Sequence, residues 1–228
     1  MTFKPRGVLS MVAGLLFAAA VPAFAAGELM VTPATTRVVS QHDQRVTVRN
    51  MGDEPMYLSI SVKKVTNPGV AKETTVDLGD LERPGLIASP DKLTLGPNQS
   101  RQITLQSLME VPQEELYRLY VVPVKSLKVD DAPADKITAP LSVSIGYGVL
   151  VRHLPKPLKQ RAAWAHRCEK GGITLESTGT VRSVFDDVVV GDGKQAQTIA
   201  VFPGTPQHFA ATRMSFRVDE KPVTLACP

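Results

Sequence analysis

In the stretch APLSVSIGYGVLVRHLP, residues 139–155, bulky apolar residues alternate with small ones from Leu141 to Val149. Successive side chains of a β-strand point to opposite faces, so this pattern predicts a long strand with one apolar face and one nearly bare face. The apolar positions are Leu141, Val143, Ile145, Tyr147, Val149 and Val151. One interpretation is a strand that closes the core of its own domain. The other is a strand whose apolar face also serves a partner.

Shorter strands separated by turns fill the rest of the chain. RVTVRN (45–50), MYLSISVKKV (56–65) and ELYRLYVVPVKS (115–126) are rich in β-branched and aromatic residues, and LTLGPNQSRQITLQSL (93–108) contains two strands around a Gly-Pro-Asn turn. GITLEST, VRSVFDDVVV, TIAVFPG, RMSFRV and VTLAC follow later, with GDGK (191–194) as a hairpin turn. Proline and glycine recur too often for long helices. The pattern predicts an all-β protein built from antiparallel sandwiches.

The chain begins with a pattern typical of a secretory signal peptide. Lys4 and Arg6 precede the apolar run 8–24, and small residues at Ala23 and Ala25 predict cleavage after Ala25 or Ala26. The alternative is a membrane anchor, for which the run is slightly short. No later segment is long and apolar enough to cross a bilayer. The sequence therefore predicts an exported protein without membrane insertion.

The domain division follows from these segments. We expect a signal peptide over 1–25 and an N-terminal β-sandwich domain over 26–152. HLPKPLKQ (153–160) contains two prolines and predicts a linker, and a smaller C-terminal β-domain follows over 161–228. The C-terminal domain holds both cysteines, Cys168 and Cys227, which an oxidising compartment favours as a disulfide. Two unpaired buried thiols are the alternative.

The sequence contains no pattern typical of catalysis or of a cofactor or metal site. The four histidines, His42, His153, His166 and His208, have no metal-ligand spacing, and there is no Gly-x-Ser-x-Gly motif. The net charge of +4 comes from scattered lysine and arginine, and Lys4 and Arg6 contribute two of these charges. We therefore expect no nucleic-acid partner, no cofactor and no enzymatic activity, although an exported hydrolase or metal enzyme assembled from distant residues stays an alternative.

Several segments, taken in order, resemble the periplasmic chaperones of the chaperone–usher pathway, which assemble pili in Gram-negative bacteria. LMVTPATTRVVS (29–40) is similar to the first strand of that family, and SPDKLTLGPNQSRQITL (89–105) to its proline-containing hairpin. ELYRLYVVPV and the opening stretch resemble the last two strands of the first domain, and VFPGTPQHF (201–209) resembles a turn of the second.

The resemblance implies two immunoglobulin-like domains in a boomerang arrangement and a role in the periplasm. Such a chaperone binds pilin (fimbrial) subunits that lack their final strand, donates a strand to them and delivers them to an outer-membrane usher. By position, the donor strand would present Leu141, Val143, Ile145 and Tyr147 to the client pilin. A homodimer that caps this strand is one alternative for the free protein, and a monomer is the other.

The resemblance also implies a basic site for the client's terminal carboxylate. Arg37 matches the arginine of the family's cleft, and guanidinium suits a carboxylate because it can donate two parallel hydrogen bonds. The family usually adds a lysine from the last strand of the first domain. The ungapped position here is Leu150, and Arg152 is the nearest basic residue. We therefore expect Arg37 and Arg152 to form this anchor.

A structural pilin or adhesin is the competing interpretation, because pilins are also immunoglobulin-like. A pilin would carry its donor segment as a free extension just after the signal peptide. Here residues 27–40 have the pattern of an integrated first strand, and the donor-like strand lies in the middle of the chain. This order favours the chaperone.

Overall fold

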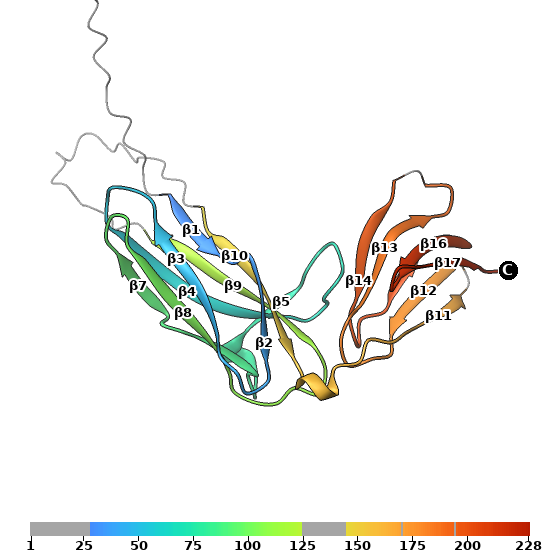
Figure 1. The fold of residues 1–228 in the computed structure, drawn as a ribbon, viewed down its shortest axis with the longest axis horizontal. Helices are drawn as coiled ribbons and strands as arrows, with labels where there is room; N and C mark the ends of the chain where they lie inside the picture. Colours follow the sequence, from blue (N-terminus) through green and yellow to red (C-terminus); the bar gives the residue numbers. More distant parts are fainter. Residues whose placement is uncertain (1–27, 125–144, 170, 194) are drawn as a thin grey trace, which may run out of the picture.

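The computed structural model describes residues 28–124, 145–169, 171–193 and 195–228. In these residues the chain forms 17 strands and two short 3₁₀ helices. Figure 1 shows them gathered in two β-sandwich domains that meet at an angle, with the junction at the bottom of the view. The fold class expected from the sequence, all-β with two immunoglobulin-like domains in a bent arrangement, is confirmed.

The first domain consists of two sheets packed face to face. One sheet has the strand order β1 (Leu29–Thr32), β3 (Gln44–Asn50), β8 (Ser100–Ser107) and β6 (Leu86–Ser89). The other has the order β2 (Thr35–Val39), β10 (Tyr147–Leu154), β9 (Glu115–Val124), β4 (Met56–Val65) and β5 (Thr75–Asp77), and β7 (Lys92–Leu95) also pairs with β4. All pairs in this domain are antiparallel except β2 with β10, which is parallel.

The core of the first domain lies between these sheets, and the alternation in the sequence explains which residues fill it. On β4, Met56, Leu58, Ile60 and Val62 are buried and the residues between them are more exposed. The expected inward positions of β3 and β8 are buried in the same core: Val46, Val48, Ile103 and Leu105. Each such aliphatic side chain stabilises the fold by about 1.5–3 kcal/mol when fully buried.

The second domain repeats the two-layer plan on a smaller scale. One sheet has the order β11 (Trp164–Glu169), β12 (Gly172–Ser177) and β15 (Gln207–Phe209). The other has the order β14 (Gln197–Val201), β13 (Ser183–Val190), β16 (Arg213–Val218) and β17 (Lys221–Ala226). A disulfide joins Cys168 on β11 to Cys227 just after β17, and therefore connects the two sheets.

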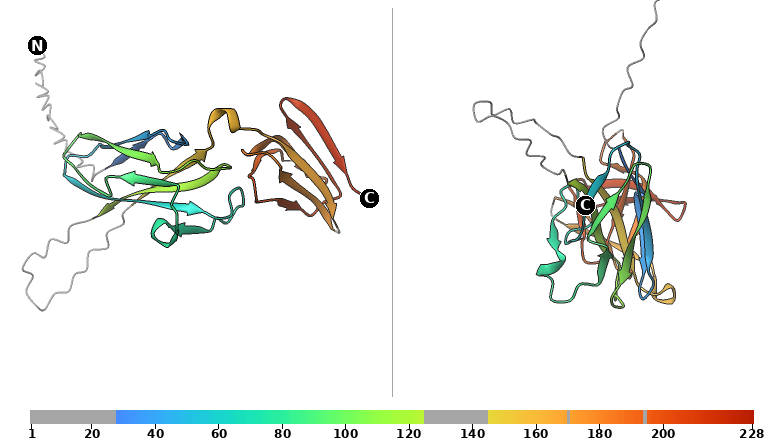
Figure 2. Two further views of the ribbon diagram at one scale, coloured as in Figure 1. Left: turned by 90° about the horizontal axis from the view of Figure 1, so that it is seen from below. Right: turned by 90° about the vertical axis from the view of Figure 1, so that its left-hand side faces the viewer.

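The domains are joined by a short 3₁₀ helix, η2 (Pro157–Lys159), which follows β10 closely. β10 continues through His153 and Leu154, two residues that the neighbouring prolines had suggested as part of the linker. Both side chains are buried, so they extend the strand toward the junction. Figure 2 shows that the chain passes from one domain to the other through this segment. Within the residues described, no helix has the length and apolar character needed to cross a membrane.

Candidate functional site

β10 has a partly unpaired edge. It pairs with β9 from Tyr147 to His153, and with β2 on its other side only from Leu150 to Leu154. Among the described residues, the segment from Tyr147 to Val149 therefore has no neighbouring strand on the side of β2. Unpaired backbone N–H and C=O groups on such an edge can accept a further strand.

The apolar side chains along this strand divide into a buried and an exposed group. Val149 and Val151 are buried in the first-domain core, with 2% and 0% of their surface exposed. Tyr147 is 38% exposed and Ile145, just before the strand, is 75% exposed, although alternation places them on the same face. Leu141 and Val143 lie outside the described residues. Val149 and Val151 thus close the core of their own domain, whereas a partner for Ile145 and Tyr147 stays a prediction.

The small residues on the opposite face have a structural reason. A Cβ atom on Gly146 would lie 3.0 Å from the side chain of Val122, and one on Gly148 would lie 3.6 Å from the ring of Tyr120. Side chains of the neighbouring strand β9 therefore cover this face. At Gly146 the contact is close enough that any larger residue would displace Val122.

Arg37 and Arg152 lie next to each other at the end of β10 closer to the second domain. They are register partners on the parallel pair β2 and β10. Both belong to the sheet face that is opposite the core: their neighbours Val38 and Val151 point inward and are fully buried. Arg37 is exposed, whereas Arg152 is only 8% exposed.

Glu114 binds Arg152 through two hydrogen bonds. Arg152 donates from Nε and Nη2 to the two carboxylate oxygens of Glu114, at 2.5 and 3.0 Å. The carboxylate also accepts a hydrogen bond from the backbone N–H of Arg182 at 2.9 Å, and the backbone N–H of Glu114 donates to the carbonyl of Thr180. This bidentate, buried ion pair therefore connects the last strand of the first domain to the second domain.

Arg182 brings a third guanidinium group to the same region. Its guanidinium carbon lies 5.7 Å from the ring centre of Phe202, in the range of a cation–π contact. Phe202 is itself buried against Val65 and Leu116 of the first domain. Burial lowers the pKa of Arg182, and the positive charges of Arg152 and Arg37 also act to lower that pKa. The guanidinium groups are thus near enough to one another for their charges to interact.

A loop between β4 and β5 also contacts the second domain, and Figure 1 shows it extending toward β14. At its tip, the carbonyl of Gly69 accepts a hydrogen bond from the side-chain amide of Gln207 at 2.9 Å. Gly69 has φ +89°, and a Cβ atom there would lie 2.5 Å from the carbonyl oxygen of Ala200. Only glycine fits this close approach.

A group of buried and partly buried polar side chains lies in the first domain, apart from the basic site formed by Arg37, Arg152 and Arg182. His153 is fully buried, and its Nε2 lies 2.9 Å from the hydroxyl of Ser107. Tyr117 donates to Glu115 at 2.5 Å, and Lys64 donates to the same carboxylate at 2.6 Å. Burial lowers the pKa of His153, and burial followed by the nearby Glu115 raises the pKa of Tyr117.

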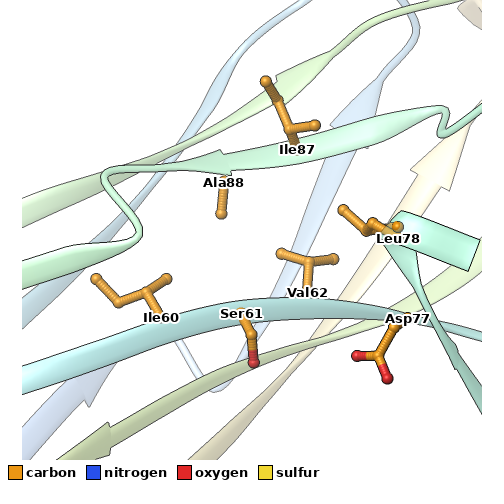
Figure 3. A pocket seen from close by; sticks show the side chains of 8 residues that line it. Ile60, Ser61, Val62, Asp77, Leu78, Ile87 and Ala88 are labelled. Atoms are coloured by element: carbon orange, nitrogen blue, oxygen red, sulfur yellow. The ribbon is translucent and has the colours of Figure 1, made fainter.

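A hollow of about 300 Å³ lies away from this site, at one side of the first domain. Figure 3 shows its walls, which come mainly from β4, β6 and the 3₁₀ helix η1 (Leu78–Asp80). The lining is mostly apolar, and its carboxylate, Asp77, forms an ion pair with Lys63. In the described part of the chain, no three histidine, cysteine or carboxylate side chains gather as metal ligands would.

The site therefore combines predicted residues with others that the sequence pattern does not single out. Arg37 and Arg152 are brought together, while Ile145 and Tyr147 extend from the other end of β10. Glu114 and Arg182 were not predicted: Glu114 joins the site by binding Arg152 within the first domain, and Arg182 joins it through a contact between the domains. For His153 a signal existed, since it continues the buried alternation of Val149 and Val151.

Comparisons with known proteins relate the chain to fimbrial proteins, although no family model matches it. A CFA/I fimbrial protein of Escherichia coli is 30% identical over 168 residues, which cover 73% of this chain and 70% of that protein. A CS1 fimbrial protein of Escherichia coli is 29% identical over the same shares of the two chains.

Solved structures share the fold. The class 5 fimbriae chaperone CfaA superposes with a TM-score of 0.69 at 23% identity, covering 88% of this chain and 99% of that one. A chain from a chaperone–tip adhesin complex of CFA/I fimbriae biogenesis has the same TM-score and identity, covering 88% and 98%. A chain from the Salmonella enterica complex of SafA pilin with the SafB chaperone has a TM-score of 0.56 at 14% identity, covering 87% and 96%.

Proposed function

The chain belongs to the fimbrial chaperone family of the chaperone–usher pathway, and we propose that it binds a pilin by donor-strand complementation. In this role, residues 141–147 pair with the incomplete sandwich of the client, and their apolar side chains fill its groove. The chaperone keeps the client soluble in the periplasm and delivers it to an outer-membrane usher. The proposed activity is binding and transfer, without a catalytic step.

The partly unpaired edge of β10 carries this proposal. Tyr147 and Ile145 are exposed on the same face on which Val149 and Val151 are buried, so the strand continues beyond the core that it completes. Leu141 and Val143 continue the alternation in the sequence. Full burial of each apolar side chain in a client groove would contribute about 1.5–3 kcal/mol, before the backbone hydrogen bonds of the added strand.

The proposed anchor for the client's terminal carboxylate is the pair of Arg37 and Arg152. Arg37 is exposed and offers a planar fork of donors that can bind a carboxylate through two hydrogen bonds. Arg152 adds positive charge beside it, and its Nη1 makes no hydrogen bond within the described residues, while Nε and Nη2 are bound to Glu114.

Related structures support a pilin or tip adhesin as the class of client. Two of the structures that share the fold contain a chaperone together with a tip adhesin or a pilin. The periplasmic location rests on residues 1–25, which have the pattern of a signal peptide and lie outside the described residues. The proposed domain boundaries at 152 and 161 lie on either side of the segment that contains η2.

A structural pilin is the competing proposal, since the two Escherichia coli relatives are named as fimbrial subunits. A pilin needs a free donor extension near the start of the mature chain. Here β1 pairs with β3 and β2 pairs with β10, so both early strands are integrated in the first sandwich. This observation favours the chaperone.

The test is co-expression in the periplasm with each pilin-like protein encoded beside this chain, followed by affinity purification. We expect a soluble one-to-one complex with at least one of them, and Arg37→Ala should weaken its retention. A chaperone that is recovered alone, while the pilin-like proteins stay soluble without it, would overturn the proposal.

A further inference from the structure

The basic site contains more positive charge than its carboxylate can balance. The guanidinium groups of Arg37, Arg152 and Arg182 interact electrostatically there and carry three positive charges. Glu114 supplies the negative charge among them, through its ion pair with Arg152. Glu114 is bound in a bidentate manner to Arg152 alone. In the described part of the chain, the guanidinium groups of Arg37 and Arg182 form no ion pair and donate no hydrogen bond.

Arg182 is held in place by contacts that leave its charged group available. Its backbone N–H is fixed by Glu114 at 2.9 Å, and its guanidinium lies over the ring of Phe202. Phe202 is buried at the contact between the domains, against Val65 and Leu116. A cation–π contact uses none of the guanidinium's N–H donors in a hydrogen bond, so Arg182 can still bind a carboxylate through them.

We infer that Arg182 binds the client's terminal carboxylate directly, together with Arg37, so that the anion site is formed by both domains. Glu114 has a positioning role: it fixes the side chain of Arg152 and the backbone of Arg182. This inference rests on the proposed function and adds a residue of the second domain to the client site. It makes client binding depend on how the two domains are oriented.

The electrostatics support the same assignment. Burial, Arg152 and Arg37 all act to lower the pKa of Arg182, and Glu114 offsets this only in part, so the charged guanidinium lies partly desolvated among like charges. A bound carboxylate removes part of this repulsion. Binding of an anion is therefore favoured by the site's own excess charge as well as by direct hydrogen bonds.

The experiment uses the full chain in complex with the pilin-like client identified by co-expression. Arg182→Gln removes the charge and keeps a polar side chain, Arg182→Lys keeps the charge, and Arg213→Gln is the matched control on an exposed arginine of the same domain. Each variant is tested with the natural client and with a client extended by four glycines, which moves its terminal carboxylate away from the site. Dissociation constants and thermal unfolding of the free chaperone are measured for every pair.

We expect Arg182→Gln to weaken binding of the natural client about tenfold, the effect of losing one charge-assisted hydrogen bond. Arg182→Lys should recover most of the affinity, and Arg213→Gln should have no effect. With the extended client, Arg182→Gln should cause no further loss.

If Arg182→Gln binds the natural client as tightly as the unchanged chain, or weakens the binding of both clients equally, the inference is wrong while the proposed function stands. If the unchanged chain forms no complex with any pilin-like protein, the proposed function fails as well.

Discussion

Arg37 lies directly beside Arg152 in the parallel register of β2 and β10, so two like charges are neighbours at one end of the strand. Like charges at such positions are destabilising unless one of them is compensated. Glu114 provides the compensation, because both of its carboxylate oxygens accept hydrogen bonds from Arg152. The ion pair therefore allows a second arginine to stay exposed and unpaired within the described residues.

Glu114→Gln should destabilise the protein, because it leaves the buried guanidinium of Arg152 without an anion next to Arg37. Breaking a buried pair by removing one partner typically costs about 3–5 kcal/mol. The measurement is urea unfolding of the purified chain. The matched control is Glu73→Gln, because Glu73 forms a bidentate pair with Arg118 that is partly exposed. This variant should lose about 1 kcal/mol or less of unfolding free energy. Equal losses for the two variants would contradict the structural role of Glu114.

Ile145→Asp should impair client binding and Val149→Asp should impair folding, although the two positions share one face of the extended chain. Ile145 is 75% exposed, so its replacement should leave the free protein folded and reduce client retention about tenfold or more. Val149 is 2% exposed, so a carboxylate there should destabilise the first domain itself. Circular dichroism and co-purification distinguish the two effects. A folded Ile145→Asp variant that retains its client in full would exclude this residue from the donor strand.

Stability should decrease as the pH falls below about 6.5, because burial lowers the pKa of His153 in the folded state. The unfolded chain then binds a proton that the folded chain does not, and protonation favours unfolding. We expect His153→Gln to reduce the slope of unfolding free energy between pH 7 and pH 5, and His166→Gln, at an exposed position, to leave it unchanged. An unaltered slope in His153→Gln would show that another group determines it.

The disulfide between Cys168 and Cys227 should stabilise the second domain by about 4 kcal/mol, since it closes a loop with a sequence separation of 59 residues. The double variant Cys168→Ser/Cys227→Ser should unfold at lower urea concentration than the oxidised chain. Reductant should shift the unchanged chain in the same direction and should not affect the double variant. Identical unfolding of the oxidised and reduced chains would contradict this prediction.

Gly69→Ala should disturb the contact between the domains, because its Cβ atom would lie 2.5 Å from the carbonyl oxygen of Ala200. We expect a change in the small-angle X-ray scattering profile and weaker client binding, if the anion site needs both domains in place. Gly79→Ala is the control, since a Cβ atom there meets open space. Scattering profiles that are the same for both variants would show that the loop does not set the domain arrangement.

The strands were predictable from the sequence because burial in a sandwich follows the two-residue period directly. Met56 to Val62 on β4 show this alternation, whereas on β10 Arg152 is buried together with its neighbours Val151 and His153. The end of β10 was less predictable, since the nearby prolines indicated a linker from residue 153. The sequence also did not show why Gly146 and Gly148 are small. The side chains that they face, Val122 and Tyr120, belong to β9, which precedes β10 by some distance in the sequence.

The basic site was predictable only in part. Arg37 and Arg152 were identified by resemblance, and the structure places them side by side. Glu114 and Arg182 are separated by 68 residues, and their contact depends on the orientation of one domain relative to the other. No local pattern in the sequence encodes such a contact. For the same reason, the loop that carries Gly69 had no predicted role.

β10 also holds Tyr147 at a fixed distance from the two arginines. Its register with β9 and β2 is fixed by hydrogen bonds, so the spacing between Tyr147 and the level of Arg37 and Arg152 is constant. The five residue steps from Tyr147 to Arg152 span about 17 Å at roughly 3.3 Å per residue of strand. Under the proposed function, a client must match this length from its terminal carboxylate to its open groove. A shift of one residue would turn the client's apolar side chains to the wrong face, so the proposed function implies that this fixed distance selects pilins according to the length of their last strand.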